Sequence, residues 1–512
     1  MWERRVREVA RSAFEPPLVL ALDVGTSSLR AVVFDRQGRP LEGCGARVAY
    51  EIESADDGTA VLAPARLVDC IVQALDRVHR ALSLSGLAVA GVGVDTFASS
   101  CLGVDALDVP LTPVYLWADT RPSPDAAAMR RELDERATHE RTGCPIHSAY
   151  LPARVRWLRR AHPEIATRVR RWVSFGEYLE LRLFGTARVS LSIASWGGLL
   201  NRHTLGWDPE WLRLLELDEH NLSPLVDRDA PLSEPRREWA ARWPLFARVP
   251  WFPAIGDGAS ANVSSGCLGA SRAALTIGTS GAMRVVLSEP VERVPWGLWC
   301  YRVDRRQALL GGALSEGGNL YAWLAQTTRL GDAALVEAEL ATMEPDAHGL
   351  TMLPFLAGER SPGWAGRARA AIMGLGLNTS PREILRAGLE AIAYRFALLD
   401  RLLSQVAQDD RHLLASGVAL LGSPAWLQIM ADVLGRPLTV SEEEATARGT
   451  ALLALDALRQ LPSGVEGVEH QRGETYRPDR ERHAQYQFAI ERQSALYRLL
   501  IDRDAQDERR DS

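Results

Sequence analysis

A strand–turn–strand pattern occurs twice in this sequence, about half a chain apart, and it constrains the fold more than any other feature. The first copy begins with the apolar run 18–22 and the second with the apolar run 273–277. In each copy a turn containing Gly-Thr-Ser follows, and then a second apolar run, which is typical of a β-hairpin. The two copies predict two related halves that face each other across a cleft.

Both turns have the composition of a phosphate-binding loop. Glycine lets backbone N–H groups point toward an anion, and the hydroxyl groups can donate hydrogen bonds to phosphate oxygens. One such turn alone would be an ordinary hairpin, whereas two copies favour a ligand that is held from two sides. The turn residues are Gly25, Thr26, Ser27 and Ser28 in the first copy and Gly278, Thr279 and Ser280 in the second.

Asp257 stands between two glycines at the predicted start of a helix, shortly before the second hairpin. A helix N-terminus favours the ionised carboxylate, which is the form that a general base requires. The alternative is that Asp257 only caps the helix. A base beside two phosphate-binding turns favours phosphoryl transfer to an alcohol.

The basic residues narrow the choice of enzyme class, because all 59 of them are arginine. A P-loop nucleotidase needs the lysine of its phosphate loop, a protein kinase needs its strand lysine, and a Schiff-base enzyme needs an amine. If this chain binds ATP, then backbone amides, hydroxyl groups, arginine and a metal must hold the phosphates.

The length of 512 residues predicts two large α/β domains, which we place at residues 17–250 and 251–501. The net charge of −6 gives no reason to expect a nucleic-acid or membrane partner. The cysteines are scattered and the first 17 residues lack the apolar core of a secretory signal, so we expect a cytoplasmic protein. The sequence leaves a homodimer open.

Two strand-like segments of the first half end in polar residues. The run 87–94 leads into 95–100, and the run 113–116 leads into Trp117, Asp119 and Arg121. Ligands bind at the carboxyl ends of strands in α/β sheets, so both segments are candidate substrate contacts. Trp117 can lie against a sugar face, while Asp119 and Arg121 can bind hydroxyl groups or a carboxylate. The alternative is a core tryptophan beside a surface ion pair.

These motifs, from Leu18 to about Pro437, resemble those of the FGGY carbohydrate kinase family. The resemblance implies a two-domain actin-like (ribonuclease-H-like) ATPase fold with an interdomain cleft, and ATP-dependent phosphorylation of a small sugar or sugar acid. The segments 296–301 and 353–362 are most similar to gluconokinase-type members, and xylulokinase-type members come next. A non-catalytic sugar or nucleotide sensor with the same fold is the remaining alternative.

The resemblance also implies roles for single residues. Asp257 would be the catalytic base, and Asp23 would lie near Mg²⁺. Val418 replaces a glycine that is usual in the adenosine motif, and a β-branched residue tolerates a positive φ poorly, so we expect an altered adenine pocket. The expected ATP contacts are Asp23, Gly25, Thr26, Ser27, Ser28, Gly278, Thr279, Ser280, Gly318, Gly417 and Val418, and the expected substrate contacts are Ser99, Trp117, Asp119, Arg121 and Asp257.

Two further segments of the resemblance are interpreted as structural. Arg154 stands where the family usually has lysine, in a segment that we expect to be scaffold. Glu359 and Arg360 lie in a loop similar to one of the family, and we expect them to pair with each other. At Ser99 and its neighbour Ala98 several relatives have a histidine or a charged residue, so either the usual substrate contact is missing or a larger substrate fills the space.

Overall fold

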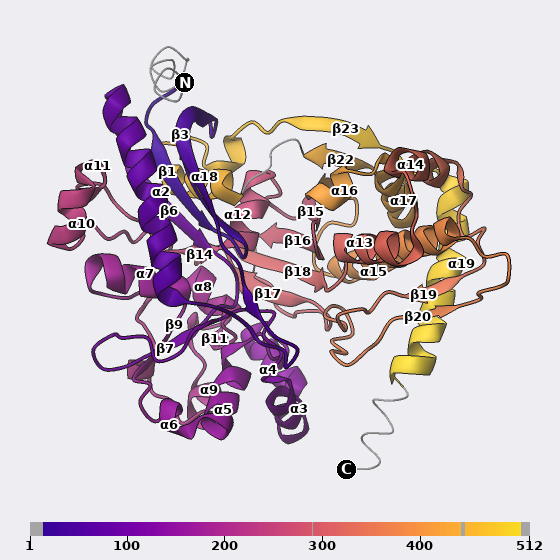
Figure 1. The fold of residues 1–512 in the computed structure, drawn as a ribbon, viewed down its shortest axis with the longest axis horizontal. Helices are drawn as coiled ribbons and strands as arrows, with labels where there is room; N and C mark the ends of the chain where they lie inside the picture. Colours follow the sequence, from indigo (N-terminus) through magenta and orange to yellow (C-terminus); the bar gives the residue numbers. More distant parts are fainter. Residues whose placement is uncertain (1–13, 289, 442–445, 503–512) are drawn as a thin grey trace.

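The computed structural model describes residues 14–288, 290–441 and 446–502, and two large β-sheets organise them (Figure 1). The first sheet has the order β14 (Ile255–Gly256), β6 (Gly91–Thr96), β1 (Val19–Val24), β2 (Ser28–Phe34) and β3 (Pro40–Ala49). The second sheet has the order β17 (Trp299–Arg302), β18 (Ala308–Leu314), β16 (Gly281–Leu287), β15 (Arg272–Ile277), β21 (His412–Ser416), β22 (Leu438–Ser441) and β23 (Arg472–Tyr476). β1 and β2 pair antiparallel, as do β15 and β16, so both predicted hairpins are confirmed.

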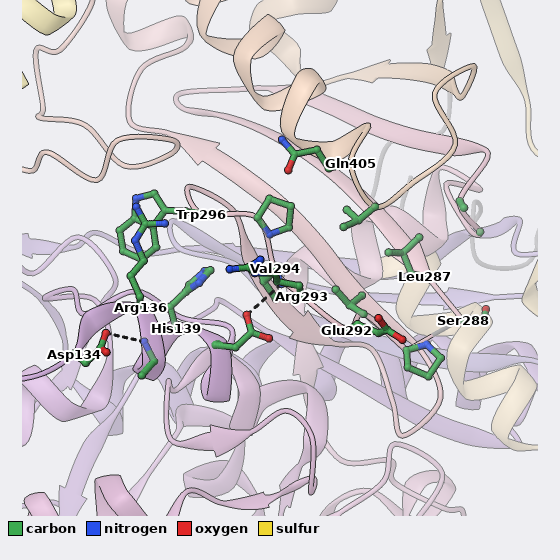
Figure 2. Close-up of a pocket in the computed structure, with 18 residues that line it drawn as sticks. Asp134, Arg136, His139, Leu287, Ser288, Glu292, Arg293, Val294, Trp296 and Gln405 are labelled. Atoms are coloured by element: carbon green, nitrogen blue, oxygen red, sulfur yellow. Dashed lines mark hydrogen bonds between the residues drawn. The ribbon is translucent and has the colours of Figure 1, made fainter.

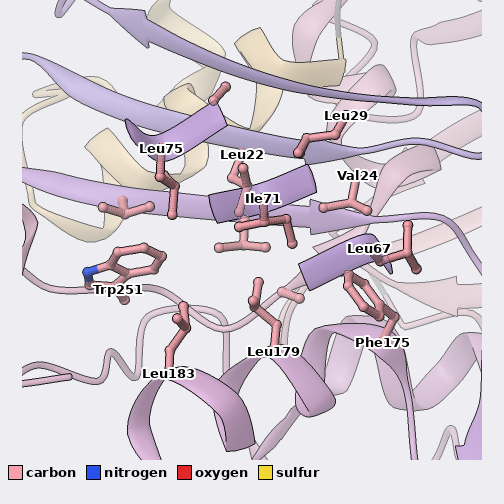
Figure 3. Packing of buried hydrophobic residues seen from close by; sticks show 14 of the residues in the cluster. Leu22, Val24, Leu29, Leu67, Ile71, Leu75, Phe175, Leu179, Leu183 and Trp251 are labelled. Carbon is pink, nitrogen blue, oxygen red and sulfur yellow. The ribbon is translucent and has the colours of Figure 1, made fainter. Parts of the chain in front are cut away.

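The first sheet is buried on both faces, which explains the continuous apolar run of β1. Alternate side chains of a strand point to opposite faces. Leu22 and Val24 therefore pack on one face with Ile71 of α2 (Pro64–Ser85) and with Phe175 of α7 (Phe175–Phe184), as Figure 3 shows. Val19 and Ala21 of β1 belong to a second cluster on the opposite face.

Helix α18 (Thr446–Ala457) belongs to the second half of the sequence, yet it packs on the first sheet against β1, β6 and α12 (Asp257–Ser264) (Figure 1). Two glycines permit this close packing. A Cβ atom on Gly93 of β6 would lie 2.9 Å from the Thr450 carbonyl oxygen, and one on Gly449 would lie 1.8 Å from the Ser260 carbonyl oxygen. The chain therefore crosses back, and α18 places Thr450 beside the first sheet.

The second sheet is covered by α13 (Gly318–Thr328), α15 (Pro381–Leu403), α17 (Pro424–Leu434) and α19 (Arg480–Tyr497), which share one core with it. Helix α15 begins with a capping box between Ser380 and Glu383, and α17 ends at Gly435, which adopts a left-handed conformation. None of the helices that the structure describes is long and apolar enough to cross a membrane.

The remaining elements are mostly short. They are β4 (Glu53–Ser54), β5 (Ala60–Leu62), β7 (Leu102–Val104), β8 (Val114–Tyr115), α3 (Ser123–Glu132), α4 (Glu135–Thr142), α5 (Leu151–Ala161), α6 (Pro163–Ala166), β9 (Arg171–Val173), β10 (Val189–Ser190), α8 (Leu191–Trp196), β11 (Leu200–Asn201), β12 (Gly206–Trp207), α9 (Pro209–Leu214), β13 (Leu225–Val226), α10 (Arg237–Arg242), α11 (Pro244–Ala247), α14 (Ala333–Thr342), β19 (Thr351–Leu353), β20 (Ala371–Met373) and α16 (Val418–Leu421).

Strand β14 bears on the division into domains. It lies beyond residue 250, yet it pairs parallel to β6 in the first sheet. A boundary at 250/251 would separate β14 from this sheet. We therefore propose that the boundary lies between α12 and β15, and that Asp257 belongs to the first domain.

Candidate active site

Three aspartates converge at one edge of the first sheet. β1 and β6 are parallel, and Asp23 lies directly opposite Asp95 in their register. β14 pairs parallel to the other side of β6, so Asp257, which follows β14 directly, emerges at the same edge. The carboxyl ends of parallel strands are where α/β proteins bind ligands. The sequence predicted individual functions for Asp23 and Asp257, and included Asp95 only as part of the candidate substrate segment 95–100.

Burial and mutual repulsion make this cluster unusual. Burial raises the pKa of Asp95 well above its ordinary value, and the charge of Asp23 adds to the effect. Burial also raises the pKa of Asp23, although Arg30 on the neighbouring strand opposes it. Asp95 accepts a hydrogen bond from the Thr450 hydroxyl through Oδ2, while its buried Oδ1 has no partner among the described residues. The cluster therefore has too few positive neighbours for all of its carboxyl groups to be ionised at once.

Asp257 is the first residue of α12, and its position argues against the helix-cap alternative. Gly256 occupies the N-cap position, and Asp257 Oδ1 accepts a 2.8 Å hydrogen bond from the N–H of the next residue, Gly258. Burial raises the pKa of Asp257 to about 6, against the opposing charge of Arg284. The helix N-terminus favours the ionised carboxylate, but the loss of solvation outweighs the helix dipole, so the pKa is raised.

The glycines on both sides of Asp257 accommodate a tryptophan. A Cβ atom on Gly256 would lie 2.5 Å from Trp196 Nε1, and one on Gly258 would lie 2.9 Å from Trp196 Cη2. The Trp196 ring stacks on Tyr301 of β17 with centroids 4.0 Å apart. Trp196 comes from α8 of the first half, so aromatic rings of both halves meet beside the candidate base. No sequence motif predicts this contact between distant residues.

The two hairpin turns differ in what their backbones contact. In the first turn the Gly25 N–H donates to the Ser28 carbonyl at 3.1 Å. In the second turn the carbonyls of Gly278 and Thr279 accept hydrogen bonds of 2.8 and 3.1 Å from the N–H groups of Gly318 and Asn319 at the start of α13. Gly318 therefore supports the turn through its N–H group, and its contact with a nucleotide stays a prediction.

Gly417 and Val418 have different conformations. Gly417 adopts a φ of 95°, and a Cβ atom there would lie 2.4 Å from the Ile277 carbonyl oxygen, so this position requires glycine. Val418 begins the short helix α16 and is 71% exposed. The concern that a β-branched residue would be strained here is wrong, because only Gly417 needs the positive φ. A contact of Val418 with adenine remains a prediction.

The predicted sugar contacts of the first half are largely occupied by protein. Asp119 is buried and accepts a 3.0 Å hydrogen bond from Arg121 Nε, and the Arg121 guanidinium lies 4.7 Å from the Trp157 ring centre. Ser99 donates a 2.8 Å hydrogen bond to the Trp196 carbonyl. The structure thus shows the ion pair that was the alternative for Asp119 and Arg121. Because these two side chains bind each other, the structure does not support their predicted contacts with substrate.

Arg154 confirms its expected structural role. Its side chain is buried and donates to the carbonyls of Ser99 and Leu116, which fixes the two loops that follow β6 and β8. The expected pair between Glu359 and Arg360 is wrong. Glu359 pairs with Arg395, whereas Arg360 donates to the Leu314 carbonyl and lies 4.9 Å from the Trp117 ring centre.

A large cavity of about 1030 Å³ lies away from the three aspartates (Figure 2). Its lining comes from α4, from residues 287–288 and 290–296 between the end of β16 and β17, and from Gln405 and Val406, which follow α15. In it the Arg136 guanidinium lies 4.0 Å from the Trp296 ring centre, and His139 Nε2 donates a 2.7 Å hydrogen bond to the Leu298 carbonyl. None of the residues predicted for the sugar or nucleotide lines this cavity, so we do not assign it to the active site.

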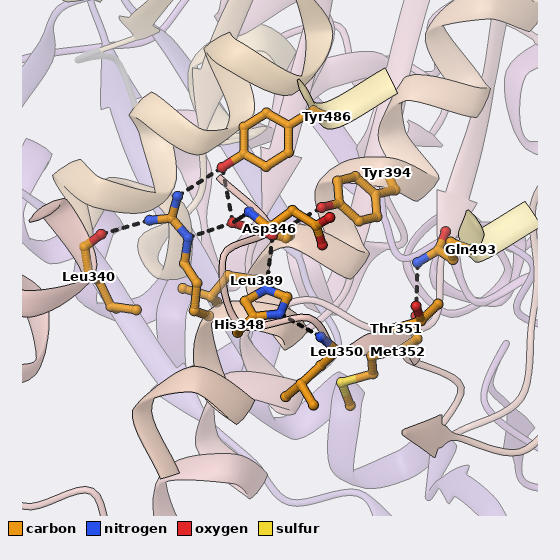
Figure 4. Close-up of polar contacts among 12 residues, drawn as sticks. Leu340, Asp346, His348, Leu350, Thr351, Met352, Leu389, Tyr394, Tyr486 and Gln493 are labelled. Atoms are coloured by element: carbon orange, nitrogen blue, oxygen red, sulfur yellow. Dashed lines mark hydrogen bonds and ion pairs between the residues drawn. The ribbon is translucent and has the colours of Figure 1, made fainter. Parts of the chain in front are cut away.

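A group of acidic and histidine side chains, Asp346, His348 and Glu390, lies close enough together to suggest a metal site. Figure 4 shows why the group is better explained as a hydrogen-bond network. His348 Nε2 lies 3.1 Å from Glu390 Oε2 while its Nδ1 accepts the Leu350 N–H at 2.9 Å, so both ring nitrogens are used. Asp346 is paired with Arg492.

Comparison with known proteins agrees with this geometry. The N-terminal domain of the FGGY family of carbohydrate kinases matches residues 18–264, and the C-terminal domain of the same family matches residues 273–458. The chain is 27% identical to a gluconokinase of Bacillus subtilis over 471 residues, which are 90% of this chain and 91% of the relative. It is 27% identical to a xylulose kinase of Escherichia coli over 506 residues, which are 94% of this chain and 99% of the relative.

Solved structures show the same fold. A gluconate kinase from Lactobacillus acidophilus superimposes with a TM-score of 0.87 at 22% identity, over 94% of this chain and 98% of that one. A xylulose kinase from the same organism gives a TM-score of 0.87 at 23% identity with the same coverage. The predicted two-domain actin-like ATPase fold is therefore confirmed. The chain is a carbohydrate kinase that belongs to the FGGY family.

Proposed function

We propose that this kinase transfers the γ-phosphate of Mg·ATP to a hydroxyl group of gluconate, with Asp257 as the general base. The observation that carries the proposal is the position of Asp257. It lies at the same sheet edge as Asp95 and Asp23, directly after β14, which pairs with β6, and its pKa is about 6. A base with this pKa is mostly ionised at pH 7 and still accepts a proton effectively.

The residues at this edge fit a magnesium ion and the phosphates of ATP. Carboxylate oxygens are the ligands that Mg²⁺ prefers, and Asp23 and Asp95 present them on adjacent strands, with the buried Asp95 Oδ1 unpartnered among the described residues. Asp23 would hold the ion and the two Gly-Thr-Ser turns would hold the phosphates. A bound magnesium ion neutralises negative charge on the transferring phosphoryl group.

The proposed reaction requires one proton transfer and one displacement. Asp257 accepts the proton of the substrate hydroxyl as the hydroxyl oxygen forms a bond to the γ-phosphorus. The bond between this phosphorus and the β–γ bridging oxygen breaks, and ADP leaves with that oxygen. Phosphoryl transfer depends mainly on positioning and on charge neutralisation, which suits a site between two halves that approach each other at Trp196 and Tyr301.

The choice of gluconate has two supports. The chain resembles gluconokinases over nearly its whole length, and the positive charge of Arg284 acts at Asp257, where it would attract a sugar acid. A pentulose of the xylulose type is the second candidate, because a xylulose kinase structure superimposes equally well. A sugar sensor is the third candidate, and it differs from both kinases because it would release no ADP when the sugar is added.

The test is ADP release from Mg·ATP in the presence of gluconate, xylulose, ribulose or glycerol. We expect strong turnover with gluconate, and a loss of about 10²–10⁴-fold in kcat for Asp257→Asn. Asp332→Asn is the matched control, since Asp332 caps the exposed start of α14 and should leave kcat unchanged. A sensor would instead show protection from thermal unfolding by a sugar without turnover, and turnover with xylulose alone would overturn the choice of gluconate.

A further inference from the structure

Arg284 on β16 has hydrogen-bonding capacity that the protein leaves unused. Its Nε and Nη1 atoms are withdrawn from solvent and donate to no oxygen or nitrogen of the described residues. Leaving a charged donor without a partner is unfavourable, because the group has lost its hydration without compensation. Such an arginine is expected where a ligand supplies the missing acceptor.

The alternation of β16 directs Arg284 toward the space between the two halves. Met283 and Val285 belong to the core of the second half. Val286 belongs to the cluster that includes Trp196 and residues of the first half, and Arg284 lies on this same face of the strand. A Cβ atom on Gly258 would lie 3.5 Å from Arg284 Nε, so the guanidinium lies against the start of α12.

A second arginine approaches the same space. Arg360 donates to the Leu314 carbonyl and lies over Trp117, but its Nε also has no partner among the described residues. The charges of Arg360 and Arg284 act on each other, and the nearby acids are Asp257 and Glu316. Glu316 already accepts the Ala357 N–H.

Buried arginines of this chain are held in two ways: some donate to backbone carbonyls, as Arg154 does, and others pair with a carboxylate. Arg386 pairs with Glu390 and Arg395 pairs with Glu359. Arg284 differs, because Asp257 accepts from a backbone N–H instead. The contrast indicates that the acceptor for Arg284 is an anionic group of a bound molecule.

We propose that Arg284 binds the carboxylate of the sugar acid and makes this kinase prefer an aldonate over a neutral polyol, with Arg360 as the second cation beside it. The inference rests on the proposed function. It assigns to Arg284 the role that the sequence suggested for Arg121, whose guanidinium is held by Asp119. Arg284 lies three residues along β16 from Gly281, a distance of about 10 Å, so this anion site is separate from the phosphate turn.

The experiment compares gluconate with gluconamide, a neutral analogue of the same length, in the wild type, Arg284→Met and Arg284→Lys. Arg302→Met on β17, which is separated from β16 by β18, is the matched control, because the Arg302 guanidinium already donates to the carbonyls of Asp304 and Arg305. Both kcat/KM and protection from thermal unfolding by each compound without ATP are measured.

We expect the wild type and Arg302→Met to prefer gluconate over gluconamide by about 100-fold, Arg284→Met to lose this preference mainly through KM, and Arg284→Lys to retain part of it. A wild type without preference would overturn the inference, as would an Arg284→Met variant that loses both compounds equally. Gluconate could protect the wild type but not Arg284→Met from thermal unfolding, while neither protein phosphorylates gluconate. In that case the inference stands and the proposed kinase reaction with gluconate fails.

Discussion

Two polar clusters of this protein differ in how far they compensate buried carboxyl groups with hydrogen bonds and opposite charge. Around Glu390, both carboxylate oxygens accept hydrogen bonds, from Arg386 and Tyr486 at Oε1 and from His348 and Tyr394 at Oε2 (Figure 4). Burial alone would raise the pKa of Glu390, but the hydrogen bond from His348 and the charge of Arg386 lower it below its ordinary value. This carboxylate is fully compensated by the protein.

At the sheet edge of the first half the compensation is incomplete. Burial raises the pKa of Asp23, Asp95 and Asp257, and two nitrogens of the nearby Arg284 have no partner within the part of the chain that the structure describes. Both clusters have comparable residue types, so composition does not distinguish them. The unused donors and acceptors do, and they mark the cluster where a ligand, a metal ion or a reaction completes the charge balance.

The largest expected effect on stability comes from the compensated cluster. Glu390→Gln removes the charge that balances Arg386 while it keeps the size of the side chain, and we expect the free energy of unfolding to fall by about 3–5 kcal/mol. Urea unfolding followed by circular dichroism measures this change. Glu383→Gln in the first turn of the same helix is the control, with an expected loss of about 1 kcal/mol or less. Equal losses for both variants would contradict the comparison.

The pH dependence of activity tests the cluster around Asp257. The pKa of Asp257 is set by burial and by Asp23, which raise it, and by Arg284 and the Gly258 N–H, which lower it. Since the base must be ionised, kcat/KM for gluconate should fall about tenfold per pH unit below about pH 6 and become constant above about pH 7. Initial rates between pH 5 and 8 test this, and a profile that is flat down to pH 5 would contradict it.

A smaller effect is expected at Ser99, whose hydroxyl is already bonded to the Trp196 carbonyl. Ser99→Ala should lower the free energy of unfolding by about 1 kcal/mol through loss of this bond. The KM for the sugar should change by less than about threefold, because the hydroxyl is not available to a substrate in this geometry. Substrate titrations and denaturant unfolding of the same preparation measure both quantities, and a KM increase of tenfold or more would place Ser99 in the sugar site.

The features that the sequence predicted are local ones. The two hairpins and the helix start at Asp257 each depend on residues within a few positions of one another, so turn composition and apolar runs were sufficient. The kinase family followed from the same motifs. The raised pKa of Asp257 was not predicted, because the surroundings of this side chain depend on Trp196 and Arg284, which are distant in the sequence.

The features that the sequence did not predict depend on contacts between distant segments. Arg360 donates to Leu314 rather than pairing with its neighbour Glu359. Thr450 reaches Asp95 only because α18 crosses back to the first sheet. Arg284 has no distinguishing neighbours in sequence, and only the alternation of β16 against the packed first half reveals where it points. Strand pairing and helix packing of this kind leave little trace in a single sequence.

The measurement that tests the contrast most directly is the urea unfolding of Asp257→Asn beside Glu390→Gln at pH 7. The pKa of Asp257 is about 6 in the folded protein and about 4 in the unfolded chain, so the folded state binds this proton more tightly and loses stability as the pH rises from about 4 to 6. The amide removes that penalty.

We therefore expect Asp257→Asn to raise the free energy of unfolding by about 1–2 kcal/mol, while Glu390→Gln lowers it. Opposite signs would show that Asp257 is retained at the expense of stability and Glu390 for its sake. A loss of stability in both variants would contradict the account, because Asp257 would then be compensated by the protein as Glu390 is.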